Sequence, residues 1–169
     1  SKAPYLETDT QMGEKQEVLG EGLIGVEALA KFLNIPVIKT TKTLFYKADD
    51  VIYAVAVRGD YQVNELKLKK LLKVKKLELA SKEDIKELTG AEVGYAGILN
   101  LPESIKVIYD DSLKGRMNFE TGANKTNYHI INVIFGRDIP EPSEYFDIKM
   151  AKEVNYFFLM KDAVEKSPG

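Results

Sequence analysis

The sequence predicts a compact α/β domain in which helices flank a β-sheet. Three observations indicate this class. Segments with apolar residues at helical spacing alternate with β-branched or aromatic runs, two of these runs lie only two residues apart, and the chain has no internal repeat or low-complexity linker. With 169 residues, of which 44% are apolar and 30% charged, the chain is long enough to bury one substantial core.

The composition excludes several classes of function. The chain has no cysteine, so disulfides and thiolate metal sites are impossible, and we expect a cytoplasmic protein. No apolar run approaches the roughly 20 residues of a membrane span, and the N-terminal stretch lacks the apolar centre of a signal peptide. The net charge of −2 argues against a surface that binds nucleic acid everywhere, so any such contact must be local.

The elements can be assigned in chain order. Residues 1–16 are polar and unpatterned, which predicts an arm, and a helix follows in which Val26, Leu29 and Leu33 recur before a stop near Asn34. Two strands come next, and the turn residues between them predict a hairpin. The strands are expected at 43–48 and 51–57.

The second half alternates in the same way. Asn64 can cap a helix that ends near residue 72, and Ser81 can cap a short helix that stops at Gly90. A glycine-rich loop then precedes two strands, expected at 105–110 and 130–136, and a loosely helical tail is expected at 153–166.

The stretch GEGLIG at 20–25 has the glycine spacing of a dinucleotide-binding loop at the start of a helix. That fingerprint should follow a buried strand and open a βαβ unit. Here the half-charged KQEVL precedes it and a hairpin follows the helix. We therefore interpret it as a loop whose glycines set the direction in which the chain enters the helix, and we expect no cofactor.

Four separated motifs are more specific. They are KTTKTLFYKA (39–48), VRGDYQVNELKL (57–68), TGAEVGYAG (89–97) and TGANKTNYHIINVIFGRD (121–138). In this order and spacing they resemble the editing domain inserted in bacterial-type prolyl-tRNA synthetases, which also occurs as free-standing deacylases of the YbaK/ProX group. The resemblance implies a mixed, strongly curved sheet flanked by helices. It also implies an editing domain at 17–150 and a segment at 151–169 that rejoins a larger synthetase, so we expect a piece excised from a longer enzyme.

The implied reaction is hydrolysis of the ester that joins a wrong amino acid to the 3′ end of tRNA(Pro). A pocket for proline cannot strongly reject the smaller alanine, because missing methylene groups give only about 1–3 kcal/mol of discrimination. Lys42 matches the family lysine that holds tRNA phosphates. Gly94 and Gly97 match a turn whose N–H groups can stabilise an oxyanion. No metal is expected, because the carboxylates are scattered without ligand spacing.

His129, the only histidine, stands in the motif G-A-N-x-x-x-x-H and is expected to position water or the ribose hydroxyl. A lone histidine is also compatible with a purely structural role. Asn124 and Asp138 are candidate substrate-binding residues, although a tight turn and a local pair with Arg137 explain them equally. Gly20 is a further candidate, because the family threonine near the amino-acid pocket is replaced by glycine there.

Two interpretations from different classes remain open at this stage. The first is a tRNA-ester hydrolase, acting within a synthetase or as a free-standing deacylase for alanyl- or cysteinyl-tRNA. The second is a non-catalytic module that holds the tRNA end or a partner protein. The departures from the family at Gly20-Glu21 and at Ile98, where the family has Thr-Pro and proline, leave alanine as the first expected substrate and cysteine as the second.

Overall fold

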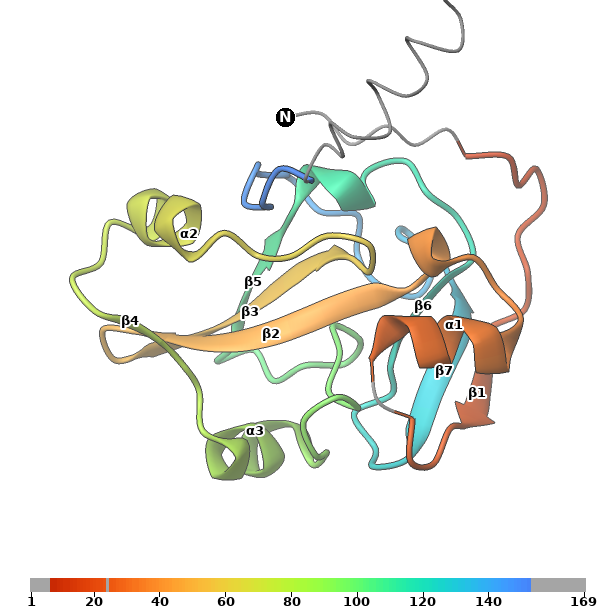
Figure 1. Ribbon diagram of the computed structural model, residues 1–169, viewed down its shortest axis with the longest axis horizontal. Helices are drawn as coiled ribbons and strands as arrows, with labels where there is room; N and C mark the ends of the chain where they lie inside the picture. The colour runs from red at the N-terminus through yellow and green to blue at the C-terminus, as the bar shows by residue number, and fades with distance from the viewer. Residues whose placement is uncertain (1–6, 24, 153–169) are drawn as a thin grey trace, which may run out of the picture.

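The computed structural model describes residues 7–23 and 25–152, which form two β-sheets and three α-helices (Figure 1). The helical tail expected at 153–166 lies outside the described residues. One sheet has the order β1-β7-β6 and contains β1 (Gln16–Leu19), β6 (Phe119–Gly122) and β7 (Tyr128–Val133). The other has the order β4-β2-β3-β5 and contains β2 (Thr41–Ala48), β3 (Val51–Arg58), β4 (Leu77–Leu79) and β5 (Lys106–Tyr109).

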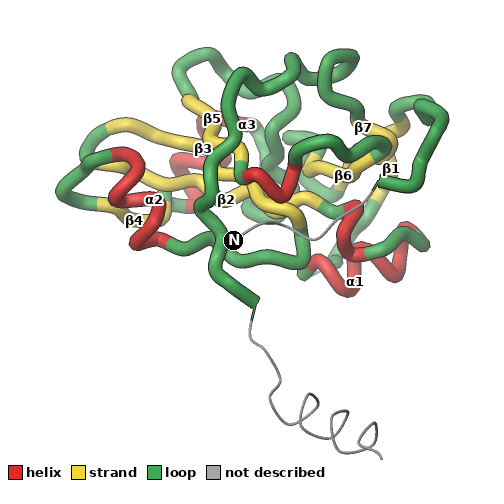
Figure 2. The backbone as a smooth tube through the Cα atoms, turned by 90° about the horizontal axis from the view of Figure 1, so that it is seen from above, coloured by secondary structure: helices red, strands yellow, loops and turns green. Residues whose placement is uncertain are grey.

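The sheets confirm the mixed α/β class. The β3–β5 pair is parallel, and all the other named pairs are antiparallel. The predicted hairpin forms in perfect register from Thr41↔Arg58 to Ala48↔Val51, and Asp49 takes the left-handed conformation in its turn with φ 52°. The strands divide between two sheets that adjoin each other, with the four-stranded sheet on the left and the three-stranded sheet on the right of Figure 2.

The helices begin and end where the sequence predicts. They are α1 (Val26–Leu33), α2 (Glu65–Leu72) and α3 (Lys82–Thr89), with short 3₁₀ helices at Val37–Lys39 and Asp111–Leu113. Asn64 accepts hydrogen bonds from the N–H groups of Leu66 and Lys67, and Ser81 accepts one from Asp84 N–H. Asn34 and Gly90 end α1 and α3 in the left-handed conformation.

The two faces of the β2–β3 hairpin carry different helices (Figure 1). Leu68 of α2 packs with Tyr46, Val55 and Val57, whereas Ile85 of α3 packs with Phe45 and Ala54. Since successive side chains of a strand point to opposite faces, these two clusters lie on opposite sides of the sheet. A third cluster joins Ala56 to residues of the three-stranded sheet and includes the buried Ile98.

The GEGLIG segment shows why the dinucleotide interpretation fails. A strand, β1, does precede the loop. That strand is an edge strand, largely exposed and antiparallel to β7, and not the buried parallel strand that a βαβ unit requires. Gly25 caps α1 with φ 82°, so the loop does set the entry of the helix.

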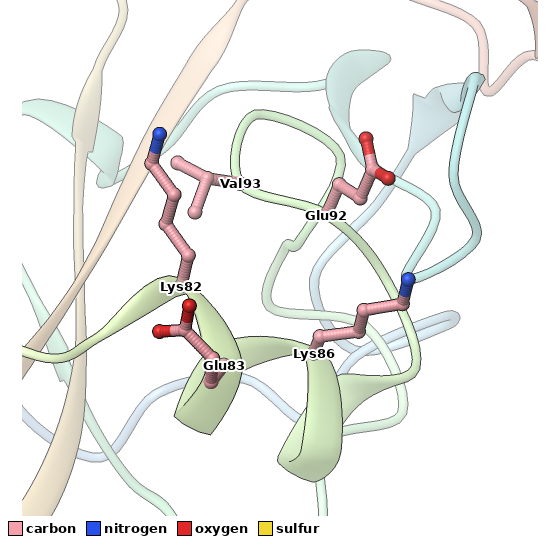
Figure 3. A pocket seen from close by; sticks show the side chains of 5 residues that line it. All are labelled: Lys82, Glu83, Lys86, Glu92 and Val93. Atoms are coloured by element: carbon pink, nitrogen blue, oxygen red, sulfur yellow. The ribbon is translucent and has the colours of Figure 1, made fainter.

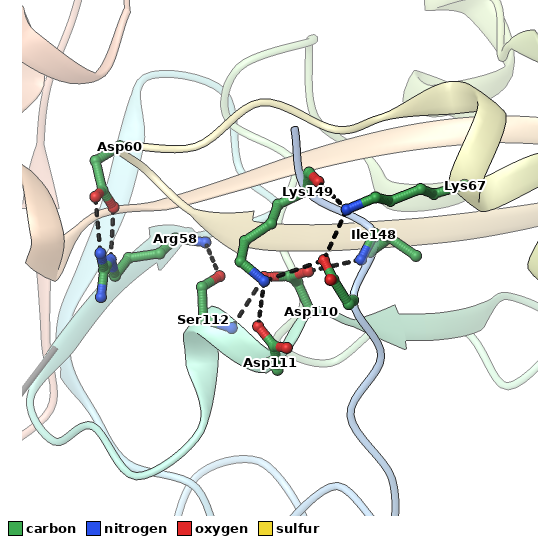
Figure 4. Close-up of polar contacts among 9 residues, drawn as sticks. Arg58, Asp60, Lys67, Asp110, Asp111, Ser112, Ile148 and Lys149 are labelled. Carbon is green, nitrogen blue, oxygen red and sulfur yellow. Dashed lines mark hydrogen bonds and ion pairs between the residues drawn. The ribbon is translucent and has the colours of Figure 1, made fainter. Parts of the chain in front are cut away.

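A buried polar network holds the end of β3 to the last described part of the chain (Figure 4). The carboxylate of Asp110 accepts hydrogen bonds of 2.9 Å from the N–H groups of Ser112 and Ile148. Ser112 Oγ accepts one of 3.0 Å from Arg58 N–H. The fully buried Lys149 donates to Asp111 and Asp147. These hydrogen bonds compensate the burial of the groups that make them, so the network fixes the turn that follows β3.

Candidate active site

A cavity of about 290 Å³ lies between the two sheets and α1. It is lined by Lys42 of β2, Gly94 of the glycine-rich turn and His129 of β7, three of the four predicted catalytic residues. Leu23, Val26 and Leu29 supply an apolar wall from the α1 side. The other lining residues are Gly25, Thr41, Thr43, Leu44, Val93, Ala96, Glu120 and Gly122.

His129 is held on several sides. Its Nδ1 lies 3.2 Å from Oε1 of Glu120, and the side chains of the two residues are 5% and 1% exposed. The Tyr95 ring lies 5.3 Å from the imidazole, and Tyr95 Oη donates to the carbonyl of Gly20. Because a carboxylate oxygen accepts, we infer that Nδ1 carries a hydrogen, which in the neutral form of the ring leaves Nε2 as an acceptor.

Glu120 was missed by the sequence analysis. Its Oε2 accepts a hydrogen bond of 3.3 Å from Thr41 N–H, so one carboxylate joins β2 of the four-stranded sheet to His129 of the three-stranded sheet. The motif that we quoted from the sequence begins one residue later, at Thr121. An acidic residue inside the short buried strand FETG was the available signal, since a buried carboxylate needs partners.

Lys42 is half-buried in the cavity wall, and its Nζ donates a hydrogen bond of 3.0 Å to the carbonyl of Tyr61. Burial lowers the pKa of the Lys42 ammonium, and the charges of Glu27 and Asp60 oppose this shift. An ammonium has three donors, so two remain after the bond to Tyr61. Lys42 is therefore oriented by the fold.

The turn that follows β3 orients Lys42. Arg58 Nε pairs with Asp60 Oδ1 at 2.5 Å, and Tyr61 N–H donates to the Arg58 carbonyl. A Cβ added at Gly59 would lie 1.8 Å from Oγ1 of Thr40, so only glycine fits. The R-G-D-Y motif thus places the Tyr61 carbonyl that holds Lys42.

Gly94 lies on the cavity surface with φ 98°, a conformation that favours glycine. A Cβ added there would meet nothing within 4 Å, so the backbone faces open space. Within residues 7–23 and 25–152, the N–H groups of Gly94 and Ala96 donate no hydrogen bond. Both residues line the cavity, so their N–H groups are candidate donors to a ligand there.

Gly97 lies just outside the cavity, where it packs against β6. Its N–H donates to Oδ1 of Asn124 at 2.8 Å, and Nδ2 of Asn124 donates to the carbonyls of Gly97 and Leu99. A Cβ on Gly97 would lie 2.4 Å from the Gly122 carbonyl oxygen. Gly97 and Asn124 thus shape the turn that carries Gly94, and neither lines the cavity.

The two remaining candidates lie in different places. A Cβ on Gly20 would lie 2.9 Å from Cδ2 of His129, so Gly20 packs directly on the histidine. Asp138 lies away from the cavity and lines a separate hollow. Its Oδ2 accepts from Ile134 N–H at 2.9 Å and pairs with Arg137. Burial raises the pKa of the Asp138 carboxyl, but these bonds outweigh burial and lower it.

In the part of the chain that the structure describes, no group of three or more His, Asp or Glu residues is arranged to hold a metal ion. The described helices are also too short or too polar for any of them to span a bilayer.

Comparison with known proteins decides the family. Residues 21–139 match the model of the aminoacyl-tRNA editing domain. The chain belongs to this family. The resemblance drawn from the four motifs is thereby confirmed, and the cavity lies within the matched residues.

The relatives include longer proline–tRNA ligases. The chain is 51% identical over 128 residues to the proline–tRNA ligase of Caldicellulosiruptor bescii, which covers 76% of this chain and 22% of that protein. It is 36% identical over 148 residues to the proline–tRNA ligase of Listeria innocua, covering 86% of this chain and 26% of that protein. The chain therefore spans about a quarter or less of the length of these curated relatives.

Solved structures confirm the fold of the editing domain. The hypothetical protein APE2540 superposes with a TM-score of 0.61 at 25% identity, covering 70% of this chain and 79% of the other. A protein proposed as a trans-editing enzyme for prolyl tRNA synthetase superposes with a TM-score of 0.67 at 17% identity, covering 81% and 87%. The likeness to the second protein concerns the fold alone.

Proposed function

We propose that this chain is the editing domain of a bacterial-type proline–tRNA ligase and that it hydrolyses alanyl-tRNA(Pro). The observation that carries the proposal is the cavity that gathers Lys42, Gly94 and His129 from three separate segments of an aminoacyl-tRNA editing domain. We also propose a cytoplasmic location, because the curated relatives are named as tRNA ligases and charged tRNA is used on cytoplasmic ribosomes.

The proposed reaction is attack of water on the ester carbonyl. A C–O bond forms between the water oxygen and the acyl carbon, and the bond from that carbon to the ribose oxygen breaks. The water proton passes to the leaving ribose oxygen, so free alanine and uncharged tRNA result. The neighbouring ribose hydroxyl is the proposed base, which leaves the protein to bind, orient and stabilise charge.

Each cavity residue has a role in this proposal. The N–H groups of Gly94 and Ala96 are the proposed donors to the developing oxyanion, since both residues line the cavity and neither N–H group donates to another described residue. Nε2 of His129 is the proposed acceptor for the water or the ribose hydroxyl, with Glu120 fixing the tautomer. Lys42, with two donors remaining, is the proposed contact to a tRNA phosphate.

The remaining candidates have supporting roles. Gly97 and Asn124 hold the turn that carries Gly94, and Gly20 sets the position of His129. Asp138 stabilises the segment after β7 and is given no contact with substrate. We propose the domain limits 17–150, with 1–16 as an arm and 151–169 as the segment that rejoins the synthetase.

A deacylation assay with alanyl-, cysteinyl- and prolyl-tRNA(Pro) tests the proposal. We expect alanyl-tRNA to be hydrolysed fastest and without added metal. Replacing Lys42 with alanine should lower the rate about 100-fold, because a lost anchor misplaces the ester. The matched control is Lys47→Ala, which removes a lysine of the same strand that does not line the cavity.

The outcomes separate the two classes of function. Background rates on all three substrates would overturn the hydrolase and leave a module that only binds tRNA or a protein. Equal losses for Lys42→Ala and Lys47→Ala would overturn the role of Lys42 alone. A faster rate on cysteinyl-tRNA than on alanyl-tRNA would keep the hydrolase and change its substrate.

A further inference from the structure

A second, apolar pocket adjoins the catalytic cavity and has no role in the mechanism proposed above. It measures about 190 Å³ and shares five lining residues with the cavity, so the two hollows have a common wall. Phe45 and Ile85 form its buried floor. Leu79 and Val93 form its rim and are 60% and 50% exposed, which is unusual for large apolar side chains gathered beside one pocket.

The common wall contains an unsatisfied polar atom. Thr43 lines both hollows, and its Oγ1 is buried with no hydrogen-bond partner among the described residues. A buried hydroxyl without a partner is unfavourable, and a small shift of the side chains around it would let a polar group of a ligand satisfy it. Because Thr43 belongs to the wall that both hollows share, the junction is suited to a ligand that spans both.

The outer side of the apolar pocket carries positive charge. Lys82 lines it and also lines a third hollow, of about 290 Å³, that continues over α3 (Figure 3). Figure 3 shows Lys82 beside Val93 and Lys86 one turn further along the helix. Neither lysine has an ion pair within the described residues, although Glu83 and Glu92 also line the third hollow. Lys82 is the one charged residue that lines the apolar pocket.

We propose that the apolar pocket binds the adenine of the terminal nucleotide, with its ribose beside Thr43 and its ester in the catalytic cavity. This inference rests on the proposed function. A nucleobase has two flat faces that favour apolar contact, which suits a pocket rimmed by Leu79 and Val93. Base and ester belong to one nucleoside, which matches two hollows with a common wall. Lys82 lies where the phosphate backbone would leave the pocket.

Two minimal substrates test this assignment. They are the alanyl esters of adenosine and of uridine, which carry the same ribose ester and differ only in the base. We expect kcat/KM to be on the order of tenfold higher for the adenosine ester, as one base contact typically provides. Leu79→Asp should abolish this preference, and Leu66→Asp, at a leucine on α2 that is 80% exposed, should leave it unchanged.

The hydroxyl at the common wall is tested by Thr43→Val, which keeps the shape of the side chain. The variant should fold normally and lose part of the preference for the adenosine ester. An independent test is an NMR titration of the wild-type protein with AMP. We expect amide shifts at Thr43, Leu79 and Val93, and weaker binding by Leu79→Asp than by Leu66→Asp.

Each outcome decides the inference. Equal rates on the two esters, together with unchanged amides at these positions on AMP addition, would overturn the adenine pocket and leave the hydrolase intact. If Leu79→Asp changes the choice between alanyl and cysteinyl esters and not the choice of base, the pocket belongs to the amino acid and the inference is wrong. Hydrolysis of neither ester nor of alanyl-tRNA would overturn the proposed function, while AMP binding at the pocket would still support the inference.

Discussion

Adding one methyl group at Gly20 tests how tightly His129 is held. A Cβ there would lie 2.9 Å from Cδ2 of His129 and 3.1 Å from Cδ1 of Leu23. The imidazole has little room to retreat, because Glu120 contacts its Nδ1 and the Tyr95 ring lies 5.3 Å away. The contact with Leu23 is the longer of the two. We therefore expect the histidine contact to decide the cost of Gly20→Ala.

The size of the effect follows from two opposing contributions. Extra atoms in a packed interior typically cost about 1–3 kcal/mol. The φ of Gly20 lies outside the left-handed region, so alanine can adopt it without strain. Because alanine also lowers the conformational entropy of the unfolded chain, it stabilises the fold by about 0.4–1 kcal/mol. The expected net loss in the free energy of unfolding is about 1–2 kcal/mol. The displaced imidazole should also lower the deacylation rate.

A double-mutant cycle isolates the contact. Urea unfolding is measured for the wild type, Gly20→Ala, His129→Ala and the double variant. Removing the imidazole removes the clash, so Gly20→Ala should cost almost nothing in the His129→Ala background. The same loss in both backgrounds would refute the reasoning, because the methyl group would then clash with something other than the histidine.

The remaining predictions concern stability. Burial alone would raise the pKa of the Asp60 carboxyl, but hydrogen bonds and charges from Arg58 and Lys152 outweigh it and lower the pKa to about 2. A depressed carboxyl pKa stabilises the fold above the ordinary value near 4, and this contribution of about 2 kcal/mol is lost as the pH falls towards 2. In Asp60→Asn, the free energy of unfolding should therefore fall less steeply between pH 4 and 2 than in the wild type. Urea unfolding at several pH values measures this, and the same slope in both proteins would contradict the prediction. Gly97→Ala should lower the free energy of unfolding by about 3 kcal/mol, because its Cβ would meet the Gly122 backbone, and an unchanged urea midpoint would contradict it.

Local signals were enough to predict the helices and the central hairpin. Asn64 and Ser81 cap their helices through bonds to residues two or three positions away, and such bonds are visible in the sequence. The strands β1, β4 and β6 were not predicted, because they depend on residues far away in the chain. They have three or four residues, include charged side chains and form because a distant partner strand is present, as when Glu17 pairs with Ile130.

The residues of the candidate site were also predictable only where a local motif marks them. Lys42, Gly94 and His129 were found through motifs, and the structure brings all three to one cavity. Glu120 and Thr43 were not singled out, since their importance depends on contacts between segments far apart in the chain. No local pattern predicts that one carboxylate will form hydrogen bonds with both a histidine and the first residue of β2.

The position of His129 also bears on the two roles that a lone histidine can have. The Nδ1 side is structural, because Glu120 joins it to the N–H of Thr41 and thereby connects the two sheets. The Nε2 side has no hydrogen-bond partner among the described residues, and the ring lines the cavity. A structural contact on one nitrogen fixes the tautomer and orientation of the other, so the structural role supports the proposed positioning role. The same contact explains why Gly20 must lack a side chain, since a ring held in this way cannot yield to a neighbour.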